Sequence, residues 1–235
     1  IEEIIRRIIS LRAAFVDKAL EVKSQQPDWF VSKDMRSTVF CRCASDTMGA
    51  IAGLINAAGY MLKPEWWTHH FKTTPTSHVC RNYAQRHEEF IKFAFVLVFF
   101  SGIESSIRQI VRTIHPIEFS NSTTSFYSVS NRLLTDLQIP EFMSSLDLFR
   151  EIRNSSHNNG VYFNAKGDRT LEYKHAKYHF QNGKKLDFVT WQLILSLVED
   201  TFDMLVRIVS HQDVAGLHYI EDPYSANLSD LEEMS

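Results

Sequence analysis

The chain is poor in the residues that make disulfides, turns and disorder. Its 235 residues include only three cysteines, eight glycines and six prolines, against 17 phenylalanines. An odd cysteine count, with Cys41 and Cys43 separated by one residue, argues against a disulfide framework and favours a reducing compartment, so we expect a cytoplasmic protein. The few glycines and prolines exclude a loop-rich chain, and the 44% hydrophobic content supplies a sizeable core. These features predict a globular, mainly helical protein.

Two further absences narrow the function. The longest apolar run, Phe93 to Gly102, has about ten residues, whereas a membrane span needs roughly 20. We therefore predict a buried helix there and no membrane partner. The net charge of −3 lacks the basic excess with which general nucleic-acid binders neutralise phosphates. Any contact with nucleic acid must then be local.

The spacing of apolar residues predicts a succession of helices. We expect a short helix that starts at Pro64, and longer helices over about 1–22, 34–61, 79–114, 128–137, 140–158 and 191–208. After Gly160 the chain changes to short extended pieces separated by turns, of which Asn182-Gly183 is the clearest, and this predicts a small β-meander over about 161–188. We expect one domain over 1–210, with its core at about 79–210, and a loosely held acidic tail over 211–235.

Two polar side chains interrupt the apolar face of the helix predicted over 140–158. Arg153 and His157 fall on the apolar side of the helical projection, one turn apart. We expect both to point toward the interior or its rim, where a charge needs a partner because its desolvation is costly. Glu104 interrupts an apolar sector of the helix over 79–114 in the same way, and an arginine fork can hold a carboxylate through two hydrogen bonds. The sequence therefore predicts an ion pair between Arg153 and Glu104.

The end of the same helix gathers amide side chains. Asn154, Asn158 and Asn159 surround His157, and we expect Gly160 to take the left-handed conformation that closes the helix. Amides beside an arginine and a histidine can bind a phosphate or a ribose hydroxyl. The cluster therefore has the composition of an anion or RNA site without a metal.

These two segments together resemble a known family. The helix "FFSGIESSIRQIVRTI", followed by "LFREIRNSSHNNGVYF", is similar to the HEPN superfamily, whose signature is an arginine, a polar residue and, after a short spacer, a histidine. Arg153, Asn154 and His157 match these positions, although the spacer is shorter than usual, and counting from Arg150 gives a longer one. The resemblance covers about residues 83–210. It implies an up-and-down four-helix-type bundle, often dimeric, with extra N-terminal helices and the β-meander as an insertion.

The resemblance also implies a function. Many members are metal-independent endoribonucleases of toxin-antitoxin or phage-defence systems, and they use no cofactor. His157 would act as acid and base on a ribose 2′-hydroxyl, Arg153 would stabilise the phosphate, and Asn154 would complete the catalytic set by positioning the substrate. The substrate-binding set would consist of Asn158, Glu104, Arg108 and Arg150. We expect RNA and a second copy of the chain as partners, with an antitoxin-type protein as a further candidate.

Simpler structural roles remain open for the same residues. The alternative is a catalytically inactive HEPN-like binding or scaffold domain, in which Arg153 and Glu104 lock two helices and His157 satisfies helix carbonyls. A third is a nucleotide-binding or nucleotide-transferring protein. The cysteines and the other histidines lack the spacing of zinc ligands, so we expect no metal. We expect Trp66 and Trp67 to pack a short helix on the bundle rather than to stack on bases.

Overall fold

The fold is mainly helical, with 70% of its residues in helices, which confirms the predicted class. The computed structural model describes residues 1–25, 33–119 and 124–223. These described residues form eight α-helices, a π-helical turn (η1), a 3-10 turn (η2) and one β-hairpin. Their bounds are α1 Glu2–Gln25, α2 Met35–Ile55, η1 Asn56–Tyr60, α3 Pro64–Phe71, α4 Ser77–Ile114, α5 Phe126–Asp136, η2 Pro140–Phe142, α6 Met143–Ser156, β1 Arg169–Tyr173, β2 Ala176–Phe180, α7 Trp191–Ser210 and α8 Gln212–Ala215.

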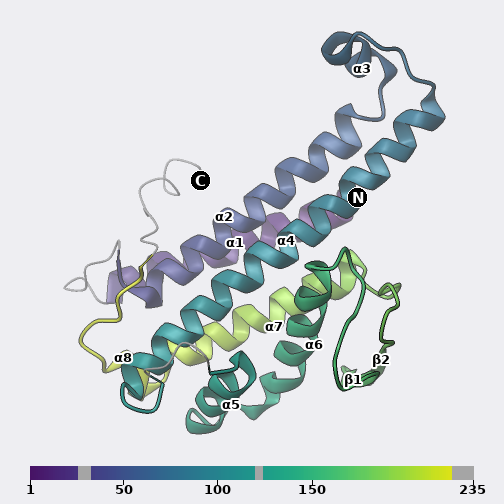
Figure 1. Cartoon of the computed structure of the whole chain (residues 1–235). Coiled ribbons are helices and arrows are strands. Elements are labelled where there is room, and N and C mark those ends of the chain that lie inside the picture. The colour runs from purple at the N-terminus through teal and green to yellow at the C-terminus, as the bar shows by residue number, and fades with distance from the viewer. Residues whose placement is uncertain (26–32, 120–123, 224–235) are drawn as a thin grey trace.

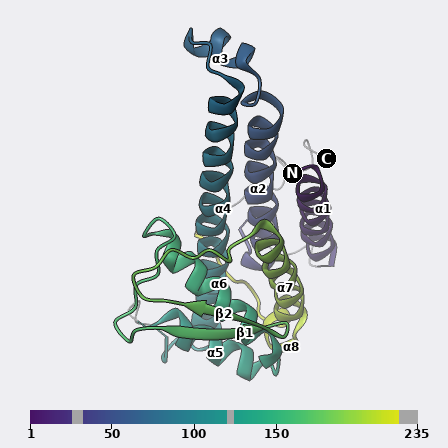
Figure 2. The ribbon, with the colours of Figure 1, turned by 90° about the vertical axis from the view of Figure 1, so that its right-hand side faces the viewer.

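Helices α2 and α4 form a long pair that runs through the whole molecule (Figure 1). Helix α1 lies along α2, and α7 packs against α1 and α6. Helices α5 and α6 and the hairpin gather around the C-terminal half of α4 (Figure 2). The opposite end of the α2–α4 pair projects beyond these elements as an arm and carries α3 at its end (Figures 1 and 2). We call the end that contains α5, α6 and the hairpin the thick end, and the projecting part of the α2–α4 pair the arm.

Phenylalanine rings fill the core at the thick end. Phe99 and Phe100 of α4 are completely buried, and their ring centroids lie 6.0 and 5.3 Å from that of Phe149 on α6. Phe100 also meets Phe126 of α5 edge to face at 5.5 Å. Aromatic rings prefer such offset and edge-to-face contacts. These contacts join α4, α5 and α6 into one rigid base.

Small residues bring α2 and α4 close together, as the sequence predicts. A Cβ atom added at Gly53 would lie only 2.6 Å from Cδ1 of Ile91, so any larger residue there would force Ile91 to move. Beyond Ile55 the helix continues as the π-helical turn, and α3 starts at Pro64 as expected. Proline suits a first helical turn because its fixed φ is helical and its missing N–H has no partner to lose there.

The chain after α7 is ordered over its described part, which corrects the expectation of a loose tail from residue 211. Ile220 and Asp222 are buried. The guanidinium of Arg36, itself completely buried, donates to the backbone carbonyls of Val214 at 2.9 Å and Leu217 at 2.7 Å, and pairs with Asp34 at 2.7 Å. A buried arginine needs such partners. The rest of the predicted tail, 224–235, lies outside the described residues.

The predicted β-meander is smaller than expected. Strands β1 and β2 pair antiparallel with Arg169 opposite Phe180, and the turn between them lies at Lys174 and His175, both with positive φ. The two outer extended pieces meet only in an isolated bridge between Val161 and Lys185. Asn182-Gly183 is a turn, as predicted, but it follows β2 instead of joining two strands. Of the extended pieces predicted over 161–188, only those at 169–173 and 176–180 form strands in the described chain.

Helix α4 satisfies, by its length and composition alone, the criteria for a membrane-crossing helix. In its most apolar stretch of 18 residues, 44% are buried within the described protein. Core helices of soluble proteins meet the same criteria.

Helix α3 lies at the end of the arm and not on the bundle. None of its eight described residues is buried, so the expectation that Trp66 and Trp67 pack it on the bundle is wrong. The two indole rings instead contact each other edge to face, with centroids 5.1 Å apart, and Trp67 also contacts Tyr83 at 5.1 Å. The indole N–H of Trp67 donates to the carbonyl of Met61 at 2.8 Å. Local aromatic contacts thus hold α3 against the ends of its neighbours.

Candidate functional site: a basic cavity at the thick end

The largest cavity described here lies between α4, α5, α6 and the loop that leads into β1. Its volume is about 830 Å³. Five cationic and three anionic side chains line it, in a protein whose net charge is −3. The cations are Arg108, Arg150, Arg153, Lys166 and Arg169, and the anions are Glu104, Glu151 and Asp168. Positive charge is thus concentrated locally, as any nucleic-acid contact of this acidic protein requires.

One carboxylate serves two arginines on the α4 side of the cavity. Oε1 of Glu104 accepts from Nε and Nη2 of Arg108 at 3.0 and 2.8 Å. Oε2 lies 3.6 Å from Nη2 of Arg153. The predicted partnership of Arg153 and Glu104 is therefore confirmed as an ion pair. The predicted two-bond fork is wrong for this pair, because Arg108, one turn along α4, makes both hydrogen bonds to that carboxylate.

Arg153 makes fewer hydrogen bonds within the protein than Arg108 does. Its Nη1 donates to the side-chain oxygen of Asn154 at 3.2 Å, and its Nε is buried with no hydrogen-bond partner among the described residues. Arg108, by contrast, also donates Nη1 to the carbonyl of Thr124 at 2.9 Å. A guanidinium has five donors and favours acceptors that it can bind in pairs, such as phosphate oxygens.

A second ion network fastens the hairpin to α6. Arg169, the first residue of β1, pairs with Glu151 at 2.5 Å and with Asp147. Arg150 pairs with the same two carboxylates, at 3.0 and 2.5 Å. Glu151 is buried, so this charge needs its partners. The network sets the position of the loop that forms one wall of the cavity.

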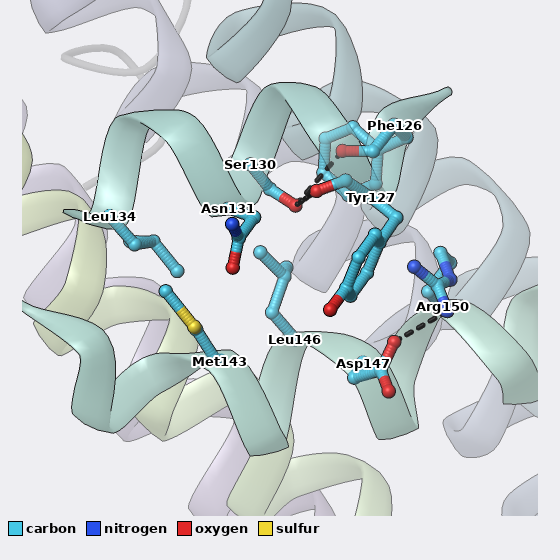
Figure 3. A pocket seen from close by; sticks show the side chains of 9 residues that line it. All are labelled: Phe126, Tyr127, Ser130, Asn131, Leu134, Met143, Leu146, Asp147 and Arg150. Carbon is cyan, nitrogen blue, oxygen red and sulfur yellow. Dashed lines mark hydrogen bonds and ion pairs between the residues drawn. The ribbon is translucent and has the colours of Figure 1, made fainter. Parts of the chain in front are cut away.

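Two exposed aromatic rings border the cavity. The side chains of Tyr127 and Phe163 are 55% and 63% exposed, and both line it. The guanidinium carbon of Arg150 lies 5.2 Å from the ring centroid of Tyr127, a cation–π contact. Figure 3 shows Tyr127 and Arg150 next to each other at a smaller pocket of about 20 Å³. Both side chains also line the large cavity. Exposed rings beside arginines suit the stacking of nucleic-acid bases.

The loop before β1 brings a lysine to the cavity. Lys166 is exposed and has no ion-pair partner among the described residues. Asn164 shapes this loop, because its side chain accepts from the backbone N–H of Lys166 at 2.8 Å and donates to the Tyr162 hydroxyl at 2.8 Å. The loop thus holds an unneutralised cation at the cavity wall.

His157 lies apart from this cavity, which corrects the expectation that it faces inward. It follows the last residue of α6, is exposed, and makes no side-chain hydrogen bond with a described residue. The buried side of α6 centres near Ile152, since Ser155 and Ser156 are buried too. That centre is about 100° from Arg153 and about 140° from His157 around the helix. Arg153 therefore reaches the rim and His157 reaches solvent.

The buried face of α6 includes two serines, because each serine hydroxyl finds a hydrogen-bond acceptor within the helix. Ser155 and Ser156 each donate to the carbonyl four residues back, on Glu151 and Ile152, at 2.9 Å. A projection that counts only apolar residues overlooks such side chains. Such a projection therefore places the buried face of α6 too close to Arg153.

The helix end closes as predicted at Gly160, which has φ of +80°. Its N–H donates to the carbonyl of Ser155 at 3.0 Å, and the N–H of Asn159 donates to that of Ser156 at 3.2 Å. These backbone bonds satisfy the last carbonyls, so the structural role in which His157 would satisfy them is not observed. Asn158 is exposed beside it and does not line the cavity.

The structure thus brings together five of the seven predicted site residues. They are Arg153, Asn154, Glu104, Arg108 and Arg150, while His157 and Asn158 lie outside the cavity. The predicted set of site residues does not include Tyr127, Phe163 or Arg169. The loop sequence Lys-Gly-Asp-Arg before β1 carries one signal, because it places two cations at a turn. No group of three or more metal-ligating side chains occurs among the described residues.

Comparison of the chain with protein-family models, curated proteins and solved structures finds no match in any of the three. The similarity to the HEPN superfamily therefore stays a prediction.

Proposed function

We propose that the basic cavity binds single-stranded RNA. The observation that carries the proposal is the combination of five cationic side chains with two exposed aromatic rings around one cavity. Proteins bind single strands by tracking the phosphates with positive charge and by stacking bases on aromatic rings. A duplex would present neither unstacked bases nor a shape that enters a cavity of this kind.

In this proposal each type of side chain has one task. Arg153 and Lys166 bind phosphate oxygens, because Lys166 has no ion-pair partner among the described residues and the terminal nitrogens of Arg153 make only long contacts, of 3.2 and 3.6 Å, with Asn154 and Glu104. Phe163 and Tyr127 stack on bases. Asn154 and Asp168, both exposed at the rim, offer an amide and a carboxylate to ribose hydroxyls, through which proteins distinguish RNA from DNA.

Binding of a short fluorescent single-stranded RNA, measured by polarisation in EDTA, tests this function. Phe163→Ala should weaken binding by about 1–3 kcal/mol, as expected for the loss of one stacked base. Phe90→Ala is the matched control, since Phe90 is equally exposed, at 66%, and lies outside the cavity. Equal effects of the two substitutions, or no binding by the parent protein, would contradict the proposal.

The charge contribution has its own test. Lys166→Gln should reduce the slope of log affinity against log salt by about 0.7, the value for one phosphate contact on a single strand. Lys177→Gln removes an exposed lysine on β2 outside the cavity and should leave that slope unchanged.

A second candidate function is cleavage of the bound RNA, as a HEPN-type endoribonuclease. The exposed imidazole of His157 favours it, because His157 lies within one turn of Asn154, a residue of the cavity rim. A strand that leaves the cavity along α6 would pass this histidine, which can take the proton of a 2′-hydroxyl. Two copies of the chain with their α6 ends together would supply a base and an acid.

Incubation with mixed RNA in EDTA separates binding from cleavage. His157→Ala should abolish cleavage and leave RNA affinity and the melting temperature nearly unchanged, since the side chain is exposed and unbonded. His218→Ala, at another exposed histidine outside the cavity, should leave all three unchanged. Intact RNA after incubation with the parent protein would restrict the function to binding.

A further inference from the structure

The end of the arm exposes an unusual density of aromatic and apolar side chains. We define the arm tip as residues 60–83, which comprise α3, its flanking loops and the first turns of α4 (Figures 1 and 2). Tyr60, Leu62, Phe71 and Tyr83 are 51%, 43%, 57% and 48% exposed. Trp66 and Trp67 lie between them and are only half-buried. Soluble monomers rarely leave so much aromatic surface in one place without a use.

The arm tip is also positively charged. Lys63, Lys72 and Arg81 stand against Glu65 alone, so the tip carries +2, whereas the whole chain carries −3 and the remainder therefore −5. The two lysines are the residues that flank α3 on either side. Nζ of Lys63 lies 5.9 Å from the ring centroid of Tyr60. An aromatic helix with a lysine at each end is therefore the outermost part of the arm.

The shape of the tip favours a flat partner. The cavities beside α5, α6 and the α2–α4 face are lined by residues outside the tip. The rings of Trp66 and Trp67 contact each other at 5.1 Å and Phe71 at 5.6 and 5.5 Å, so their faces are partly covered. A nucleic-acid strand needs a groove and free ring faces. A membrane surface needs neither.

We propose that the arm tip binds the surface of a membrane that contains anionic lipids. Tryptophan and tyrosine favour the boundary between headgroups and acyl chains. Phe71 and Leu62 would enter that boundary, while Lys63 and Lys72 extend their ammonium groups to lipid phosphates, as long cationic side chains do at such boundaries. The proposal departs from the expectation of no membrane partner, which rested on the lengths of apolar runs alone. Surface binding is independent of those lengths.

Aromatic side chains behind a rim of lysines also occur in protein interfaces, so the distribution of charge decides between the two kinds of partner. The two opposite charges orient the molecule. Anionic headgroups attract the arm tip, with its charge of +2, and repel the rest of the chain, with its charge of −5. Charge complementarity thus favours a lipid surface approached end-on.

Vesicle flotation tests the proposal with the full chain. The parent protein should float with vesicles of phosphatidylcholine and phosphatidylserine, and much less with phosphatidylcholine alone. Each lysine removed should weaken binding roughly fivefold at low salt, so Lys63→Gln with Lys72→Gln should nearly abolish it. Phe71→Ser should weaken binding to a similar degree. The matched controls, Lys177→Gln and Val98→Ser, change an exposed lysine and an exposed apolar residue at the thick end and should float as the parent does.

Three results would overturn the proposal. The first is no flotation of a folded parent protein with either vesicle. The second is equal flotation of tip and control variants. The third is a concentration-dependent dimer, seen by sedimentation, that Phe71→Ser abolishes without any effect on flotation, since the tip would then bind a second copy. Because α3 has no buried residue among those described, the tip variants should melt as the parent does, and circular dichroism checks this.

Discussion

Replacing Glu104 with glutamine should change stability and RNA affinity in opposite directions. This carboxylate holds Arg108 through two hydrogen bonds and lies 3.6 Å from Arg153. Both partners of the carboxylate are cationic, and all three side chains are about one-fifth exposed. Glutamine keeps the shape and one acceptor but removes the charge. The cavity therefore becomes more positive by one unit while the protein loses an ion pair.

The size of each effect follows from this geometry. Charge-assisted hydrogen bonds contribute about 1.5–3 kcal/mol and exposed pairs about 0–1 kcal/mol, so an intermediate loss of roughly 1–2 kcal/mol is expected for this partly exposed group. For a chain of this length that loss lowers the melting temperature by roughly 2–8 °C. Without the carboxylate, the guanidinium groups of Arg108 and Arg153 have more donors for phosphate. RNA binding should therefore strengthen by about two- to fivefold, and the slope of log affinity against log salt should steepen by about 0.7.

Calorimetry and fluorescence polarisation measure the two quantities on the same samples. Glu172→Gln is the matched control, because Glu172 is an exposed carboxylate on β1 outside the cavity. It should leave both quantities unchanged. If Glu104→Gln lowers the melting temperature and leaves RNA affinity at or below that of the parent, the arginines serve only to join helices, and the reasoning about the cavity is refuted.

Other predictions concern the remaining charged and thiol groups. Burial raises the pKa of Asp46 from 3.8 to about 6, although Arg42 opposes this. The folded state thus binds this proton more tightly than the unfolded state, and the contribution of Asp46 to stability falls as the pH rises from about 4 to about 6. Asp46→Asn should therefore raise the melting temperature at neutral pH and leave it unchanged at pH values below about 4. Burial raises the pKa of Cys41 to about 12 and that of Cys43 well above its ordinary value, so neither thiol should react with a thiol reagent at mildly alkaline pH until the protein unfolds. Glu151→Ala removes a buried partner of Arg169 and should destabilise the fold by roughly 2–4 kcal/mol, with faster proteolysis within residues 161–188 as the second measurement and Glu172→Ala as the control.

Periodicity predicts the helices well because each buries one continuous face. The limits of α4 and α7 agree with the predicted ones to within two residues, since Phe, Ile and Leu recur there at helical spacing. The hairpin is predicted less well. Extended pieces such as "VYF" and "KLDF" carry the composition of strands, but a strand also needs a neighbour for its backbone hydrogen bonds. Sequence composition does not report that neighbour.

The candidate site could be predicted only in part for the same reason. Glu104 and Arg153 were found because each interrupts an apolar face, and two such interruptions indicate a pair. Tyr127 and Phe163 carry no such signal, because an aromatic residue reads as core whether or not it is exposed. His157 was placed inward because the buried serines of α6 are polar and were not counted as interior. The cavity is lined by residues from four separate elements, so it can be recognised only once the tertiary fold is known.

The buried arginine at the start of α2 has a consequence for biosynthesis. Arg36 is bonded to carbonyls about 180 positions later in the chain, and Arg7 of α1 is bonded to Glu199 of α7 at 2.6 and 2.7 Å. When the first two helices leave the ribosome, Asp34 is already present to pair with Arg36, but the carbonyls that Arg36 binds and the carboxylate that pairs with Arg7 do not yet exist. These long-range bonds can form only after residue 217 has been synthesised, so we expect the N-terminal helices to complete their packing late in folding.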